Sequence, residues 1–269
     1  MKFAINYSTQ AAVLFKQGRL QLDRFKCPEW LDLIDEARRV RPVAVHFNLH
    51  AGRGKIKKKD LEWIERIADQ TQTPFINLHL EVKQGDYPQI SLDSTLAKHR
   101  KLILDGMLFE IDLVQKRFGA ERLIVENVPY RPGGNALRVC AEPELIDAVV
   151  RKTGCGFLFD IPHARIAAHY LGIDEIDYIQ SLPVDRIREL HFTGVHRFDG
   201  GLWDHHLQAQ ESDWKLLDWV LERIRVGDWS KPWLLAFEYG GVGEKFNWRS
   251  DAVEIERQSR RLYAKVNPL

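Results

Sequence analysis

Short β-type runs alternate with helical stretches along the chain of 269 residues, and this alternation constrains the fold more than any other feature. Runs of this kind, each followed by a helical period, indicate parallel strands joined by crossover helices. Eight such units predict closure into an α/β fold, the (β/α)₈ TIM barrel, as one domain over residues 1–269. The predicted strands are Phe3–Tyr7, Leu20–Lys26, Val43–Leu49, Phe75–Leu80, Leu123–Asn127, Gly156–Asp160, Ile187–Phe192 and Leu234–Glu238.

Three of the intervening segments have a clear apolar helical face. They are Asp60–Gln70, Ser94–Phe118 and a helix that opens at Pro143 and ends before Gly154. An open, doubly wound sheet is the alternative to the barrel. We rank it lower because no glycine-rich phosphate loop follows the first run and because metal-ligand residue types recur at many strands.

Composition narrows the classes of partner. The 39 basic and 38 acidic side chains leave a formal charge of +1, so no global field favours nucleic acid or a membrane surface. The start, MKFAINYSTQ, is too polar for a signal peptide, and no apolar run of membrane-spanning length occurs, so we expect a cytoplasmic protein. The basic run Arg53–Lys59 is expected to be a solvated loop and helix start. Cys27, Cys140 and Cys155 form no CxxC motif and predict neither a disulfide framework nor a thiolate zinc site; Cys27 is expected to be a small core residue.

Side chains with metal-binding groups end six consecutive predicted strands. Because residues two apart on a strand share a face, and the carboxyl ends of barrel strands meet at one mouth, these groups should converge. They are His46 with Asn48 and His50, Asn77 with His79, Glu126, Asp160, Glu189 with His191, and Glu238. Burying several carboxylates together without cations is costly. Oxygen and imidazole ligands suit zinc, manganese or iron, and their number predicts a site with more than one metal ion.

The densest stretch runs from Phe157 to His206. It contains FLFDIPHA, ELHFTGVH and WDHH, the last of which we expect to be a loop that presents Asp204, His205 and His206. Of the ten histidines, only His99 and His169 fall inside predicted helices. The others are expected at strand ends or in loops, where a scaffold presents chemistry.

Five motifs together carry a family resemblance: IVENVPY, FLFDIPHA, ELHFTGVH, DHH and AFEYGG. They resemble the nine-ligand, three-metal pattern of the xylose isomerase-like barrels, specifically the multinuclear non-haem iron-dependent oxidases, which include the methanobactin-biosynthesis oxidases. The resemblance covers Val45 to Gly240. The metal ligands that it implies are His46, His79, Glu126, Asp160, His163, His191, Asp204, His206 and Glu238.

The resemblance also implies roles. Glu126 would bridge two metals, one completed by His46 and His79 and the other by Asp160, His191 and Glu238, and these last three with Glu126 would form the catalytic centre. A third metal would take His163, Asp204 and His206. Whether His46 or His50 is the first ligand stays open, because both lie on one face of the predicted strand.

The implied activity is an oxidase with two or three iron ions, with zinc or manganese as alternative metals, that uses dioxygen to modify a ribosomally made peptide. A peptide-binding partner protein would deliver this substrate. Endonuclease IV, a three-zinc phosphodiesterase of the same superfamily, shows the same ligand order. A sugar isomerase or epimerase is a third alternative, but it would leave His163, Asp204 and His206 without a role. If the barrel were only a binding module, the whole set of ligand-type residues would have no function in catalysis.

We prefer the oxidases because of HFTGVH and because DHH runs on into a helix at Trp214. The acidic residue usual after the Asp-x-His element of these oxidases is missing, since the chain reads LQAQ there. Several neighbours of the motifs have two open interpretations. Asn127 would either orient the bridging Glu or cap its own loop. Six other residues would either contact the substrate or serve only in packing or at the solvent-exposed surface: Tyr130, Arg131, His196, Trp203, His205 and Tyr239.

Overall fold

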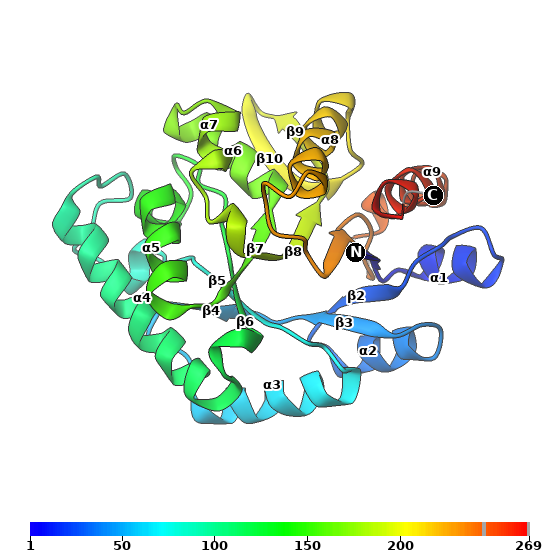
Figure 1. The fold of residues 1–269 in the computed structure, drawn as a ribbon, viewed down its shortest axis with the longest axis horizontal. Coiled ribbons are helices and arrows are strands. Elements are labelled where there is room, and N and C mark those ends of the chain that lie inside the picture. The colour runs from blue at the N-terminus through cyan, green and yellow to red at the C-terminus, as the bar shows by residue number, and fades with distance from the viewer. Residues whose placement is uncertain (244–245, 268–269) are drawn as a thin grey trace.

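Nine parallel strands form one curled sheet in the computed structural model, which describes residues 1–243 and 246–267 (Figure 1). The strands are β1 (Lys2–Asn6), β2 (Arg24–Pro28), β3 (Val43–His46), β4 (Leu49–His50), β5 (Ile76–His79), β6 (Leu123–Glu126), β7 (Gly156–Asp160), β8 (Ile187–Phe192) and β11 (Leu234–Phe237). Their order is β3-β2-β1-β11-β8-β7-β6-β5-β4. The outermost members, β3 and β4, follow each other in the chain, so the sheet closes on itself and the predicted barrel is confirmed.

The third predicted strand, Val43–Leu49, is interrupted where the barrel closes. Its first part pairs with β2 and its last residues pair with β5. Between them, the Phe47 N–H donates to Asn77 Oδ1 at 2.7 Å and Asn77 Nδ2 donates to the Phe47 carbonyl at 3.0 Å. The Asn77 side chain therefore replaces the backbone ladder at this point and holds the two ends of the sheet together.

The second predicted strand was placed too early. It begins at Arg24 instead of Leu20. Asp23 Oδ2 accepts the Phe3 N–H at 2.8 Å, so this side chain occupies the first pairing position of β1 and the backbone ladder begins one residue later.

Helices cover the outer face of the sheet (Figure 1). They are α1 (Thr9–Lys16), α2 (Leu31–Arg38), α3 (Lys58–Thr71), α4 (Ala97–Phe118), α5 (Pro143–Thr153), α6 (Ile161–Leu171), α7 (Glu175–Gln180), α8 (Glu211–Arg225) and α9 (Ala252–Val266). The three helices predicted from their apolar faces are present as α3, α4 and α5, and Gly154 ends α5 in the left-handed conformation. No helix among the described residues is long and apolar enough to cross a membrane.

The inside of the barrel is layered. Ala4, Ala44 and Ala236 form a small buried cluster within it. Two residues further along each strand stand Asn6, His46 and Glu238, which by alternation share the same face. The layer of small apolar side chains therefore supports a polar layer at the carboxyl ends of the strands.

The stretch predicted as a loop around WDHH is a strand. It belongs to β10 (Gly201–Leu207), which pairs antiparallel with β9 (Gly194–Phe198). Asp199 and Gly200 connect the two strands with φ of +47° and +76°, the left-handed conformations that an Asp-Gly hairpin turn requires. A register shift between Asp204 and Leu207, with His206 at φ +52°, places the ligand-type residues where the pairing is irregular.

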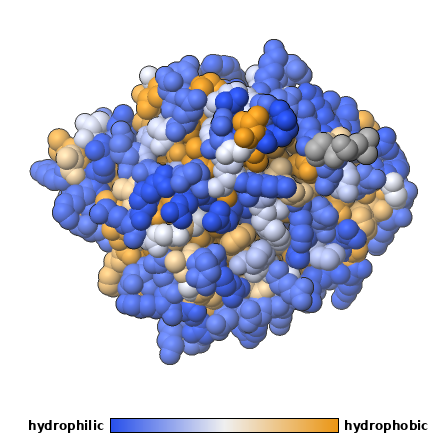
Figure 2. Space-filling view, in the orientation of Figure 1, coloured by the Kyte–Doolittle hydropathy of each residue, from blue (hydrophilic) through white to orange (hydrophobic). Residues whose placement is uncertain are grey.

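The face of the molecule in Figure 2 is mostly hydrophilic, with hydrophobic residues dispersed over it. The basic run Arg53–Lys59 is largely exposed and leads into α3 as predicted. Arg53 and Lys55 both pair with Asp86, at 2.9 and 2.6 Å, so part of this charge is neutralised within the chain.

Candidate metal centre

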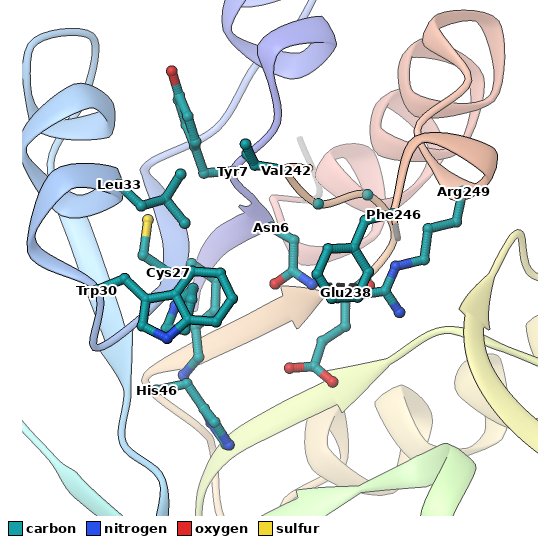
Figure 3. A pocket seen from close by; sticks show the side chains of 14 residues that line it. Asn6, Tyr7, Cys27, Trp30, Leu33, His46, Glu238, Val242, Phe246 and Arg249 are labelled. Atoms are coloured by element: carbon teal, nitrogen blue, oxygen red, sulfur yellow. Dashed lines mark hydrogen bonds between the residues drawn. The ribbon is translucent and has the colours of Figure 1, made fainter. Parts of the chain in front are cut away.

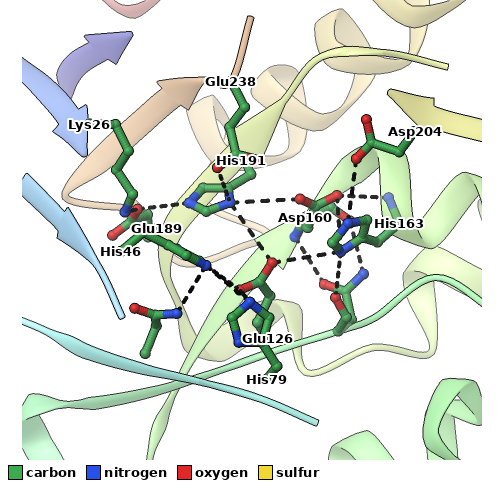
Figure 4. Close-up of polar contacts among 12 residues, drawn as sticks. Lys26, His46, His79, Glu126, Asp160, His163, Glu189, His191, Asp204 and Glu238 are labelled. Carbon is green, nitrogen blue, oxygen red and sulfur yellow. Dashed lines mark hydrogen bonds and ion pairs between the residues drawn. The ribbon is translucent and has the colours of Figure 1, made fainter. Parts of the chain in front are cut away.

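Strand register brings the ligand-type side chains to one level at the barrel mouth (Figure 4). His79 on β5 is the partner of Glu126 on β6, and Asp160 on β7 is the partner of His191 on β8. Glu126, Asp160 and His191 are almost completely buried, and Glu238 is 8% exposed just after β11. Several ionisable groups therefore share one water-poor space.

Glu126 faces two directions. Its Oε2 lies 3.3 Å from His79 Nε2 and 3.5 Å from His46 Nε2. Its Oε1 lies 3.6 Å from His163 Nδ1 and 3.9 Å from His191 Nδ1. The two oxygens thus face different ligand-type residues, although His46 and His191 also come close enough to share one ion with Glu126.

On the first side of Glu126, two imidazole nitrogens point at the same place. His79 Nδ1 donates to the Leu49 carbonyl at 2.9 Å, which leaves the lone pair of His79 on Nε2. That Nε2 lies only 3.0 Å from His46 Nε2. His50 instead lies beside Asn48 and Glu81, with Nε2 3.1 Å from Asn48 Oδ1. Of the two alternative histidines, the structure brings His46 to Glu126.

On the second side, His191 stands between two carboxylates. Its Nδ1 lies 3.2 Å from Glu238 Oε1 and 3.7 Å from Asp160 Oδ2. Asp160, His191 and Glu238 can place one ligand atom each within 4.8 Å of one another. The sets His46, Glu126, His191 and Glu126, Asp160, His163 do the same among the described residues.

The third predicted set is looser. His163 Nε2 lies 3.4 Å from Asp204 Oδ2, and His206 Nε2 lies 3.9 Å from the same oxygen. His163 was expected outside helices, but it lies in the first turn of α6, where its N–H donates to Asp160 Oδ1 at 2.7 Å. His163 Nδ1 donates to the Asn127 carbonyl at 2.9 Å, so Nε2, facing Asp204, is its available nitrogen.

Asn127 holds two predicted ligands, Asp160 and His163, but not the side chain of Glu126. Its Nδ2 donates to the Asp160 carbonyl and its Oδ1 accepts the Asp160 N–H, both at 2.9 Å. The Asn127 carbonyl also accepts from His163 Nδ1. Asn127 thus fixes the backbone of Asp160 and the ring of His163. The role foreseen for it as an orienting group therefore applies to Asp160 and His163.

A buried ion pair behind His191 was not foreseen. Glu189 accepts from His191 Nε2 at 2.9 Å and forms an ion pair with Lys26. The three residues are at most 3% exposed. Because Nε2 carries the proton given to Glu189, Nδ1 is the nitrogen that His191 offers to a metal. Only the spacing of Glu189 and His191 on one strand face hinted at this relationship in the sequence.

Charges in the centre move the pKa values of the imidazoles in opposite directions. Burial lowers the pKa of His191, but the neighbouring Glu238, Asp160 and Glu189 outweigh it and raise that pKa to about 10. Burial likewise opposes the raised pKa of His163, which Asp160, Asp204 and Glu126 cause. Burial and the nearby His79 hold the pKa of His46 well below its usual range. Cations and protons therefore compete for the carboxylate side of the centre.

The other predicted neighbours divide into three pairs. Tyr130 and Tyr239 are buried in the apolar core, as packing residues. Arg131 stacks over the Trp203 ring at 3.4 Å from its centroid, and both line a cavity of about 400 Å³ that also contacts His163 and His206.

His205 and His196 complete the set of predicted neighbours. His205 stacks on Trp203, with 5.1 Å between the ring centroids. His196 Nε2 donates to the Gln208 carbonyl, and His196 Nδ1 accepts from Gln210 Nε2, so its ring is engaged with these residues.

Residues of the centre fit metal ions. Buried side-chain atoms without a hydrogen-bond partner among the described residues include His46 Nδ1, Glu126 Oε2, Asp160 Oδ2, His191 Nδ1, Asp204 Oδ2 and His206 Nδ1. Buried polar atoms are nearly always satisfied, so a concentration of such atoms in one place fits a site that holds cations. Nitrogen and oxygen donors without thiolates suit iron, zinc or manganese.

Comparison with known proteins identifies the family. The family model of the RiPP precursor modification enzymes MbnB/TglH/ChrH matches residues 23–233. The chain belongs to this family. A UPF0276 protein of Acaryochloris marina is 28% identical over 71% of this chain and 69% of its own length. A UPF0276 protein of Chromobacterium violaceum is 26% identical over 68% of this chain and 66% of its own. The family prediction made from the ligand motifs is confirmed.

Solved structures agree on the fold. A xylose isomerase domain-containing protein from Salmonella typhimurium superposes with a TM-score of 0.61 at 15% identity, covering 99% of this chain and 97% of that protein. Endonuclease IV from Thermus thermophilus gives 0.54 at 15% identity, covering 97% of this chain and 100% of that one. The xylose isomerase-like barrel is therefore confirmed, and these likenesses concern the fold alone.

Proposed function

We propose that this member of the peptide-modifying family is a multinuclear iron-dependent oxidase that uses dioxygen to modify a ribosomally made peptide. The two oxygens of Glu126, which face separate groups of nitrogen and oxygen donors, carry this proposal. In it, Glu126 would bind two metal ions, one together with His46 and His79 and the other together with Asp160, His191 and Glu238. His163, Asp204 and His206 would hold a third.

Iron bound in this centre would supply the redox chemistry that dioxygen activation requires. The chain's own residues have separate tasks. Glu189 keeps the proton on His191 Nε2 and Asn127 keeps the proton on His163 Nδ1, so each ring presents its other nitrogen to the centre. These contacts preorganise the ligands before any metal arrives.

Family membership supports the peptide as the substrate, because the family acts on precursors of ribosomally made peptides. We further propose that a peptide-binding partner protein presents the peptide at the barrel mouth, in the cytoplasm. The cavity beside the third ligand set, which Arg131, Trp203 and Lys83 line, offers one surface for the peptide.

Phosphodiester cleavage is the main competing function. Its support is the shared ligand order and the barrel shared with endonuclease IV, which at 15% identity concerns the fold alone. A sugar isomerase would leave His163, Asp204 and His206 unused. Family membership favours the peptide oxidase over both.

Anaerobic loading with ferrous iron, followed by metal analysis and Mössbauer spectroscopy, tests the proposal. We expect two or three iron ions per chain, at least two of them in one coupled site, and oxidation of the loaded protein by dioxygen. Loading with zinc only, and no reaction with oxygen, would refute the oxidase. Cleavage of an abasic-site duplex with added zinc or manganese would support the phosphodiesterase instead.

A further inference from the structure

A cavity of about 250 Å³ opens beside the metal centre and has mostly apolar walls (Figure 3). His46 and Glu238, one proposed ligand from each side of Glu126, belong to its lining. We infer that this space, here called the apolar cavity, binds an apolar side chain of the peptide substrate, from a residue next to the one that reacts. The inference rests on the proposed function and names a feature of its substrate.

The walls come from two segments on either side of the β1 end. Trp30 and Leu33 lie at the start of α2, and Val242 and Phe246 lie in the segment after β11. Trp30 is 55% exposed, so its indole offers contact area to an incoming ligand. Large apolar side chains around a concave space indicate an apolar occupant.

Most polar side chains in the wall are already engaged elsewhere. The Tyr7 hydroxyl donates to Glu36 Oε1 at 2.7 Å, and Asn6 Nδ2 donates to the Glu238 carbonyl at 2.9 Å. Lys26 pairs with Glu189 behind the centre. Apart from Arg249 and the proposed ligands His46 and Glu238, the wall offers the hydroxyls of a sugar few partners, which disfavours a sugar there.

Arg249 supplies the exception. Its guanidinium lies over the Phe246 ring, 4.3 Å from the centroid, and Nη1 donates to the His205 carbonyl at 3.2 Å. Arg249 lines the cavity, and its guanidinium has further N–H donors besides the one on His205. One of these can donate to a backbone carbonyl of a peptide whose side chain fills the cavity. An apolar space with one such donor beside it fits a peptide residue.

Size and position restrict the occupant further. The volume is below the range of about 300–1,000 Å³ typical of whole-ligand pockets, so the cavity suits one side chain. Of the proposed ligands, all of which lie in the described part of the chain, only His46 and Glu238 line it. His163, Asp204 and His206 border the more polar cavity with Arg131. The reacting group would lie at the centre between the cavities, and the apolar side chain would belong to its neighbour in the peptide.

Fluorine NMR with N-acetyl-4-fluorophenylalanine amide tests the inference. We expect the probe to bind the zinc-loaded protein, and its fluorine signal to broaden strongly when paramagnetic manganese replaces zinc, because the ring lies beside the metals. N-acetylglutamine amide should bind at least about tenfold more weakly. Val242→Asp and Trp30→Ala should each weaken binding of the fluorinated probe, the first by about tenfold or more.

Val253→Asp is the matched control, because Val253 is 68% exposed on α9 and lies outside the cavity lining. Equal binding to the parent and to both cavity variants, or no extra broadening with manganese, would overturn the inference. A protein that takes up no metal would refute the proposed function alone. Comparing the metal-free parent with Val242→Asp and Trp30→Ala would then still decide whether the cavity binds the probe.

Discussion

Replacing Glu126 with Gln removes one negative charge at nearly constant size, and we expect it to release more than one metal equivalent per chain. Glu126 Oε2 lies 3.3 Å from His79 Nε2 and Oε1 lies 3.9 Å from His191 Nδ1, so in the proposed site one charge would serve two metal positions. Two unit charges about 4 Å apart interact by about 4 kcal/mol at an effective dielectric constant of about 20. Each position should therefore bind its metal about 1,000-fold more weakly or worse.

The comparison is with His206→Ala, which should cost about one equivalent, from the third set only. Glu62→Gln, exposed on α3, and His99→Ala, on α4, are matched controls for the two substitutions. Mass spectrometry counts the metals, and circular dichroism checks the fold. All four variants should fold, because the strands pack by apolar contacts behind the mouth.

Equal loss of one equivalent from Glu126→Gln and His206→Ala would show that Glu126 does not bridge. Full metal content in Glu126→Gln would remove the carboxylate from the centre altogether. Loss of metal from the Glu62→Gln control would mean that the assay reports general damage to the protein.

Three further predictions follow from the surroundings of the centre. Glu189→Gln should weaken metal binding by about 10- to 100-fold, which a metal titration measures. Lys26→Met leaves Glu189 buried without its cation and should lower the free energy of unfolding in urea by about 3–5 kcal/mol. The double variant should recover part of that loss. Because the pKa of His191 is raised to about 10 in the metal-free protein, metal binding at pH 7–8 should release protons, and metal affinity should rise with pH up to about 10. Calorimetry in buffers of different ionisation enthalpy measures the proton release, and finding none would contradict the prediction. Asn77→Leu leaves the Phe47 N–H and carbonyl unpaired and should destabilise the fold by about 2–6 kcal/mol in urea unfolding, with exposed Asn48→Ala as control.

The barrel could be predicted from the sequence because its strands and helices have different periods. Ile103, Met107, Ile111 and Val114 recur at helical spacing and are buried in α4. Strand ends were less predictable. Asp23 and Asn77 use their side chains in place of backbone pairing, and that contact depends on strands far apart in the chain.

The hairpin that carries Asp204 and His206 had a signal that was missed. Asp199-Gly200 between two β-type runs is a strong hairpin pattern, but the histidines drew the interpretation toward a loop. The placement of His163 in a helix follows from Asp160, whose carboxylate caps α6. A strand that ends in a helix-capping Asp therefore delivers both residues to one site.

The residues that hydrogen-bond to the proposed metal ligands could not be predicted from the sequence. Alternation put Glu189 and His191 on one face, but the partner of Glu189 is Lys26, on a strand 163 residues earlier in the chain. The curl of the sheet brings β2 and β8, which β1 and β11 separate, within reach of each other across the interior. Long-range partners of this kind have no local pattern, so the sequence predicts the ligand types better than what orients them.

An anomalous-scattering map at the iron edge, from crystals grown anaerobically with ferrous iron, tests the central proposal most directly. We predict one peak between Glu126 Oε2 and the His46–His79 pair, and a second between Glu126 Oε1 and the group of Asp160, His191 and Glu238. A third peak should lie by His163, Asp204 and His206 if that set is filled. A single peak that touches only one oxygen of Glu126, or no iron signal at these residues, would contradict the proposal.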